Sequence, residues 1–153
     1  MGIINEYERR RNKTATASCH SEAIDKNTIY KLSDIIKRTL KLLNDNEITL
    51  YLENNSRLDP IFSTSKEMEI VFNNNPNLEF LLDIAHINCY EQMKEMILIK
   101  RPKILHIADK RFNIIHEHLP IGYGEINFEY IFDQILCNYD GKIILEIVKK
   151  TLT

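Results

Sequence analysis

The chain has 153 residues, 44% of them hydrophobic, which suffices for one folded domain with a buried core and excludes a disordered protein. The net charge of −2 and the pI of about 6.2 indicate no basic surface of the kind that binds nucleic acid. No apolar run approaches the roughly 20 residues of a membrane-spanning helix. Cys19, Cys89 and Cys137 form no CxxC pair, and no signal peptide is evident. We therefore expect a cytoplasmic protein whose cysteines are reduced, small and buried.

The N-terminal part divides into three segments. Residues 1–13 are charged and without pattern, so we expect a mobile leader before a single domain over 14–153. Residues 14–19 are small and indicate a weak, buried strand. Residues 27–44 place apolar side chains at three- and four-residue steps, which predicts an amphipathic helix with Asn27 as its N-cap.

The rest of the chain alternates apolar runs with helical patterns. Strands are predicted over 47–54, 78–83, 103–108 and 142–148, and helices over 65–72, 90–100 and 127–137, with a loop over 109–125. Such near-continuous apolar strands, separated by helices, are typical of a parallel sheet buried on both faces, and hence of an α/β fold.

A metal-capable or acid–base side chain follows or ends each of the four clear strands. These are Glu53, Asp83, His106 and Glu146. Because the carboxyl ends of parallel strands meet at one edge of a sheet, we expect them on one rim. Carboxylates at buried strand ends are costly unless they are paired or bound to a metal, so the pattern favours a site over packing.

The chain's five histidines lie at or just beyond proposed strand ends. They are His20, His86, His106, His116 and His118. A mixed set of oxygen and nitrogen ligands favours a divalent ion such as Zn²⁺, Mn²⁺ or Co²⁺ over Ca²⁺.

Five segments carry a more specific resemblance, and they occur in one order along the chain. Residues 82–86 (LDIAH) contain a strand-end D-x-x-H, and residues 105–109 (LHIAD) an H-x-x-D. Residues 116–128 (HEHLPIGYGEINF) resemble the loop D-x-H-x-P-x-G-x-G-x-I-x-F, with His116 in place of the usual Asp. Residues 50–54 (LYLEN) and 144–147 (ILEI) resemble two glutamate-bearing strands. Together these motifs resemble the xylose isomerase-like TIM-barrel superfamily.

The resemblance implies a partial (β/α)₈ barrel of four to five parallel strands, because the match begins at about the family's fourth strand and a complete barrel runs to roughly 250 residues. It implies that Glu53, Asp83, His106 and Glu146 bind the central divalent metal, Mn, Zn or Co. In the isomerases of this superfamily the two glutamates also transfer protons beside a carbonyl, which would make Glu53 and Glu146 catalytic.

The remaining histidines are assigned by the same resemblance. His86 and His118 would contact the substrate or a second metal. His116 and His20 would belong to the same group, although the sequence around His20 matches less well. Gly122 and Gly124 would serve the geometry of the loop rather than bind phosphate.

Three functions follow from the resemblance. The first is a metal-dependent isomerase or epimerase of a sugar or sugar phosphate. The second is a phosphodiesterase of the AP-endonuclease type, which the missing Asp and the near-neutral charge disfavour. The third is a truncated, non-catalytic barrel fragment or subunit. Since both edges of a partial barrel expose unpaired backbone, we expect a homo-oligomer or a complementing chain that supplies the missing strands.

Each of these residues could also have a purely structural role. Glu53 and Glu146 could be solvent-facing charges at strand ends, and Asp83 with His86 could cap a following helix. The sequence equally allows a core histidine at position 106, exposed loop histidines at 116 and 118, a structural or exposed histidine at 20, and a supporting or loop role for Asp109.

Overall fold

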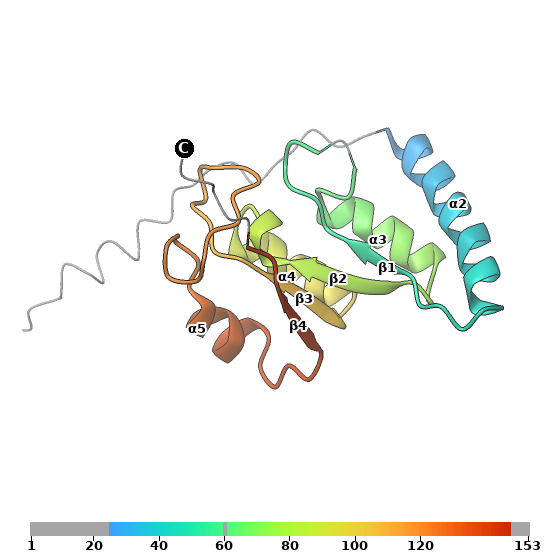
Figure 1. Ribbon diagram of the computed structural model, residues 1–153. Helices are drawn as coiled ribbons and strands as arrows, with labels where there is room; N and C mark the ends of the chain where they lie inside the picture. The colour runs from blue at the N-terminus through green and yellow to red at the C-terminus, as the bar shows by residue number, and fades with distance from the viewer. Residues whose placement is uncertain (1–24, 60, 148–153) are drawn as a thin grey trace, which may run out of the picture.

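A computed structural model describes residues 25–59 and 61–147 (Figure 1). In chain order its elements are α2 (Lys26–Asn44), β1 (Tyr51–Glu53), α3 (Ser65–Asn74), β2 (Glu79–Asp83), the 3₁₀ turn η1 (Ile84–His86), α4 (Tyr90–Ile99), β3 (Ile104–Ile107), α5 (Phe128–Tyr130), the π-helical turn η2 (Ile131–Ile135) and β4 (Lys142–Leu145). The predicted strand at 14–19, the leader at 1–13, Cys19 and His20 lie outside the described residues.

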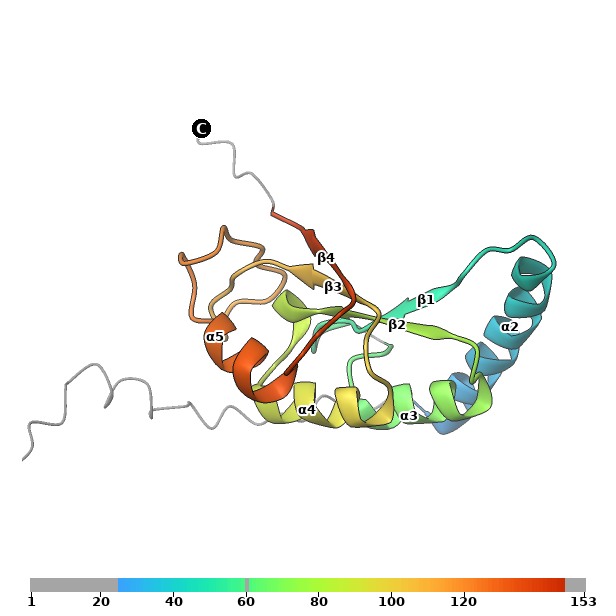
Figure 2. The same ribbon diagram turned by 90° about the horizontal axis from the view of Figure 1, so that it is seen from below.

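The four described strands form one parallel sheet in the order β1-β2-β3-β4. The prediction of an α/β fold with parallel strands and alternating helices is confirmed. The sheet is open, with β1 at one edge and β4 at the other, as expected for part of a barrel. Figure 2 shows α3 and α4 running along one face of this sheet.

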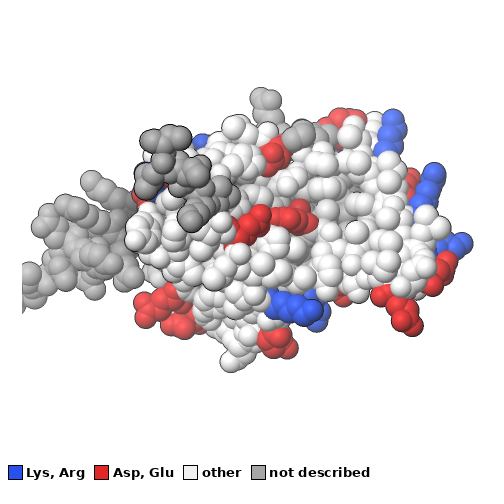
Figure 3. All heavy atoms as spheres, viewed as in Figure 1, with Lys and Arg blue, Asp and Glu red and all other residues white. Residues whose placement is uncertain are grey.

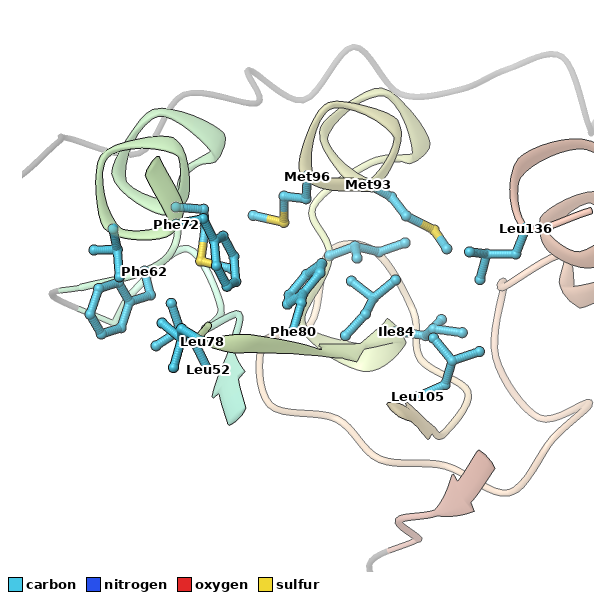
Figure 4. Packing of buried hydrophobic residues seen from close by; sticks show 14 of the residues in the cluster. Leu52, Phe62, Phe72, Leu78, Phe80, Ile84, Met93, Met96, Leu105 and Leu136 are labelled. Carbon is cyan, nitrogen blue, oxygen red and sulfur yellow. The ribbon is translucent and has the colours of Figure 1, made fainter. Parts of the chain in front are cut away.

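The core lies between that face and the helices. Phe80 of β2 is fully buried and packs edge-on against Phe72 of α3, with ring centroids 5.5 Å apart. Met93 and Met96 of α4 are also buried and face the sheet (Figure 4). Burial of this apolar surface, at about 25 cal/mol per Å², is the main term that holds the helices to the sheet.

Among the described residues, the helices bury one face of the sheet, whereas the other face of β1, β2 and β3 is only half-buried apart from Asp83, so the expected full burial of both faces is not observed. In β2 the alternate residues Phe80 and Leu82 are buried against the helices, whereas Glu79 and Leu81 are half-buried. In β4 every residue is exposed. The physical reason is that α3 and α4 both pack on the same side of the described sheet.

Several element boundaries differ from the prediction, and three of the differences affect the local structure most. The helix predicted from 27 begins at Lys26 with Asp25 as its N-cap, so Asn27 lies inside the helix. Strand β1 covers only Tyr51–Glu53 of the predicted 47–54. The helix predicted over 127–137 starts with one α-helical turn and continues as a π-helical turn, in which Leu136 N–H donates to Ile131 O (2.7 Å).

The described cysteines also depart from expectation. Cys89 is disulfide-bonded, so it is not reduced. Cys137 is free but exposed, and its thiol donates to the Asp133 carbonyl oxygen (2.7 Å) on the solvent side of η2. The cysteines therefore give no argument for a cytoplasmic location. Among the described helices, none is both long and apolar enough to span a bilayer.

Candidate metal centre

Four metal-capable side chains converge where the parallel strands end. Glu53 and Asp83 are the last residues of β1 and β2, His106 lies in β3, and Glu146 directly follows β4. The register pairs Asp83 with His106 across β2 and β3, which puts their side chains on the same face. One ligand atom from each of the four residues lies within 4.8 Å of those of the other three.

These side chains lie on the face of the sheet that α3 and α4 leave uncovered. Figure 3 shows acidic side chains gathered in the middle of the face seen in Figure 1, without a basic side chain beside them. His106 Nδ1 is 2.7 Å from Glu146 Oε2 and 3.5 Å from Glu53 Oε1. The site is therefore a negatively charged group with one imidazole.

Asp83 is the most rigidly held member of the set. Its side chain is fully buried, and its Oδ1 accepts from the backbone N–H of Ala85 (2.6 Å). The buried side chain of Asn54 extends the β1–β2 ladder by one rung: its Oδ1 accepts from Asp83 N–H (2.8 Å) and its Nδ2 donates to Asp83 O (3.1 Å). Asp83 therefore caps the 3₁₀ turn η1, as one structural alternative had it, but the cap uses only Oδ1 and leaves Oδ2 for another contact.

Two ligand atoms in this set are buried without a hydrogen-bond partner. They are Asp83 Oδ2 and His106 Nδ1; the latter approaches Glu146 closely but is not aligned for a hydrogen bond. An unsatisfied buried polar atom costs about 1–3 kcal/mol, and more if it is charged. A divalent cation would satisfy both atoms at once, and three carboxylates with one imidazole are a suitable donor set for Zn²⁺, Mn²⁺ or Co²⁺.

The electrostatics of Glu53 agree with this fit. Burial raises the pKa of the Glu53 carboxyl above its usual range, and the nearby negative charge of Asp83 raises it further. His106 and His86 act in the opposite direction, but more weakly than the burial. Without a cation, the site therefore opposes the ionised form of Glu53.

A second group adjoins the first and shares Asp83. Ligand atoms of Asp83, His86 and His118 also lie within 4.8 Å of one another. His86 Nδ1 is 2.9 Å from the carbonyl oxygen of Asn54, and His118 Nδ1 is 3.0 Å from that of Glu146. Because a carbonyl only accepts, each Nδ1 donates to it, which leaves each Nε2 as the ring atom available to the group; that of His86 lies 3.5 Å from Asp83 Oδ2.

A profile of the xylose isomerase-like TIM-barrel family matches residues 14–151, which is most of the chain. The chain belongs to this family. Among curated proteins and among solved structures, none matches the chain.

Not every histidine that the motifs of this family single out joins the two groups. His116 Nε2 lies 3.0 Å from Ser56 Oγ and 3.5 Å from Asp59 Oδ1, and its side chain is half-exposed. Its ring is an edge-on neighbour of the His86 ring, at 5.7 Å between centroids. The structure thus brings His86 and His118 beside the four strand-end residues and leaves His116 on the rim.

The loop from β3 to α5 is held by Asp109, which belongs to neither ligand group. Its Oδ2 accepts from the backbone N–H groups of Gly122 (2.9 Å) and Gly124 (2.8 Å), and its Oδ1 accepts from Ile126 N–H (3.1 Å). Gly122 has a φ of +90°, and a Cβ atom at Gly124 would collide with Asp109, so both positions require glycine. The supporting role expected of Asp109 and the backbone role expected of the two glycines are confirmed.

Sequence reasoning missed two buried residues near the site. One is Asn54, whose position directly after Glu53 was the available signal. The other is Lys110, whose ammonium donates to the carbonyl oxygen of Ile87 (3.0 Å). Burial, and after it the positive charge of Arg57, lowers the pKa of Lys110 to about 8. No pattern in the sequence distinguishes this lysine from those on the surface.

Proposed function

We propose that the chain is a divalent-metal-dependent isomerase or epimerase that acts on a sugar or sugar phosphate. One observation carries the proposal: ligand atoms of Glu53, Asp83, His106 and Glu146 lie within 4.8 Å of one another, at the ends of four parallel strands. The unsatisfied atoms of Asp83 and His106 support the view that these four residues hold the metal.

The two glutamates suit proton transfer because they come from the two edge strands and keep access to solvent. The side chains of Glu53 and Glu146 are 36% and 47% exposed, whereas Asp83 is enclosed. A carboxylate beside a bound sugar can remove a proton from the carbon next to the carbonyl and return it, which typically contributes 10²- to 10⁴-fold to the rate. A divalent cation in the site would supply polarisation of that carbonyl.

His86 and His118 complete the proposed site. With the proton on Nδ1, their Nε2 atoms can accept from sugar hydroxyl groups or bind a second cation. His116 contributes at the rim through its contacts with Ser56 and Asp59. The role proposed for His20 rests on the family motifs alone.

Solvent exchange tests the proposal. The protein is loaded with Mn²⁺, Zn²⁺ or Co²⁺ and incubated in D₂O with a panel of aldoses, ketoses and their phosphates. NMR should then detect deuterium at the carbon beside the carbonyl, together with the isomer or epimer. Glu53→Gln and Glu146→Gln should each lower the exchange rate at least about a hundredfold. Exchange that persists in both variants would refute the assignment of the two glutamates.

Glu79→Gln is the matched control. Glu79 begins β2, at the opposite end from Asp83, and pairs with Lys100 (3.8 Å). The substitution removes the same charge from the same strand but leaves the ligand group intact. It should therefore leave both metal content and exchange unchanged.

A second candidate function is a phosphodiesterase of the AP-endonuclease type. The group of Asp83, His86 and His118 favours it, since a second cation next to the first would clamp a phosphate. Metal stoichiometry and cleavage of abasic-site DNA separate the two functions. Two ions per chain with DNA cleavage would support this candidate, and one ion with sugar exchange would support the first.

A non-catalytic subunit is the third candidate. It predicts that a metal binds but that neither sugars nor abasic DNA react. Absence of metal from the reconstituted protein would instead reject both enzymatic candidates.

A further inference from the structure

Strand β4 leaves an apolar edge of the described sheet open. It pairs with β3 on one side only, and its residues Ile143, Ile144 and Leu145 are 52%, 45% and 60% exposed. The opposite edge differs, because β1 is only three residues long and its residues are buried or half-buried. Apolar side chains on an unpaired edge strand are a template for pairing with another strand.

The backbone of β4 shows which groups remain for such a partner. The N–H groups of Lys142 and Glu146 donate to the carbonyl oxygens of Lys103 and Ile107, on the β3 side. Since alternate residues of a strand direct their backbone groups to opposite sides, those of Ile143 and Leu145 point to the open edge.

We propose that two copies of the chain associate through β4, antiparallel, around a twofold axis that passes at Ile144. Such an interface is isologous, so one patch must complement itself. In this register Ile143 and the partner's Leu145 form the hydrogen-bonded pairs, and Ile144 faces the partner's Ile144. Lys142 then lies opposite the partner's Glu146, and the same pair recurs on the other side of the axis.

Charge complementarity selects this register over its neighbour. An axis at Ile143 would place Lys142 opposite an isoleucine and Leu145 opposite Gly141. The axis at Ile144 pairs a cation with a carboxylate twice and apolar residues with apolar residues, and opposite charges across a strand pair stabilise it by roughly 0.2–1 kcal/mol each. Lys142 and Glu146 are both exposed; Glu146 Oε2 lies 2.7 Å from His106 Nδ1, so the partner's Lys142 would pair with the other carboxylate oxygen, Oε1.

The association brings a residue of the second copy to the metal centre. Glu146 is the most exposed of the four strand-end residues, and the partner's Lys142 would lie beside it on the same face of the joined sheet.

A twofold axis perpendicular to the sheet keeps the helices of both copies on one side, so the strand pairing meets no obstruction from α3 and α4. Two strands alone bury less than the roughly 1,200 Å² of a stable interface, so the dimer should be weak and dependent on concentration.

Cysteine cross-linking tests the register independently of any enzymatic activity. In a Cys137→Ser background, which removes the exposed free thiol, Ile144→Cys should oxidise to a covalent dimer. Directly opposed residues in a pair without hydrogen bonds have Cα atoms about 4.5 Å apart, within the range of a disulfide. Leu145→Cys should not cross-link, because it faces position 143 of the partner. Ile121→Cys is the control: position 121 is about as exposed as position 144 but lies in a loop, so its cross-linking measures disulfides formed by random collision.

Sedimentation tests the pairing itself. The unmodified chain should shift from monomer to dimer between micromolar and several hundred micromolar concentrations. Leu145→Pro removes an N–H group that points to the open edge and spares the ladder to β3, so it should weaken the dimer at least tenfold. A monomer at every concentration, or equal cross-linking at positions 144, 145 and 121, would overturn the proposal. If Leu145→Pro misfolds by circular dichroism, the cross-linking comparison still decides.

Discussion

The two central strands and the two edge strands deliver their ligand atoms to the same site under different constraints. Asp83 ends a central strand, is enclosed, and is fixed by Asn54 and by Ala85 N–H. Glu53 and Glu146 come from the edge strands and remain partly in solvent. The central ligand is thus held by the fold whether or not a cation is bound, whereas the edge ligands can adjust. We expect substitutions at the centre to affect both metal and fold, and those at the edges to affect metal and chemistry alone.

Asp83→Asn should have the largest effect. Asp83 belongs to both ligand groups, and among the described residues its Oδ2 accepts no hydrogen bond, although it lies 3.5 Å from His86 Nε2. Structural metal sites contribute about 10–16 kcal/mol over four ligands, so loss of this one should lower metal affinity by about 3 kcal/mol, or more than a hundredfold. Titration against a competing chelator measures it. Asp133→Asn, at an exposed position of η2, is the control and should leave the affinity unchanged. The prediction would be contradicted if the metal affinity of Asp83→Asn were within threefold of that of the unmodified protein.

Asn54→Ala tests whether the centre also holds the fold. The substitution leaves the buried N–H and carbonyl groups of Asp83 without partners, at about 1–3 kcal/mol each, so unfolding free energy should fall by about 3 kcal/mol. Urea unfolding with EDTA present measures this apart from metal binding. Asn55→Ala removes one bond to the Ile61 carbonyl oxygen (2.9 Å) at a half-buried position and should cost about 1 kcal/mol. Equal losses would remove the distinction between centre and rim.

Lys110 extends the comparison to a buried cation beside the central strands. Its pKa is lowered to about 8 from 10.5, so between these values the unfolded chain binds more protons than the folded one. Stability attributable to this residue should therefore rise with pH, by about 2 kcal/mol between pH 7.5 and 10. The measurement is the unfolding free energy of the unmodified protein minus that of Lys110→Met across this range. A difference that does not change with pH would mean that Lys110 is hydrated in solution.

The contrast between centre and edge was only partly accessible from the sequence. The apolar runs and the polar residue after each run predicted the parallel strands and the four convergent side chains, because those features are local. The bare face of the sheet, the enclosure of Asp83 and the unusual pKa of Lys110 depend on which helices pack on which side, and no local pattern encodes that. The tight turn at Gly122 and Gly124 was predictable because glycine is scarce in this chain, whereas the π-helical turn at Ile131–Ile135 was not.

The edge glutamates should give the smallest effects on binding. Because the side chains of Glu53 and Glu146 have access to solvent, water can replace the oxygen that Glu53→Gln or Glu146→Gln removes, so each substitution should weaken metal binding by only about tenfold, or 1.4 kcal/mol. Neither should destabilise the metal-free protein.

Since the pKa of Glu53 is raised in the folded state, its contribution to stability is lost as pH rises through that pKa. Metal-free Glu53→Gln should therefore match the unmodified protein at pH 4 and exceed its stability at pH 7. Urea unfolding at both pH values, with EDTA present, checks this; a loss of stability at pH 7 would show that Glu53 supports the fold as Asn54 does.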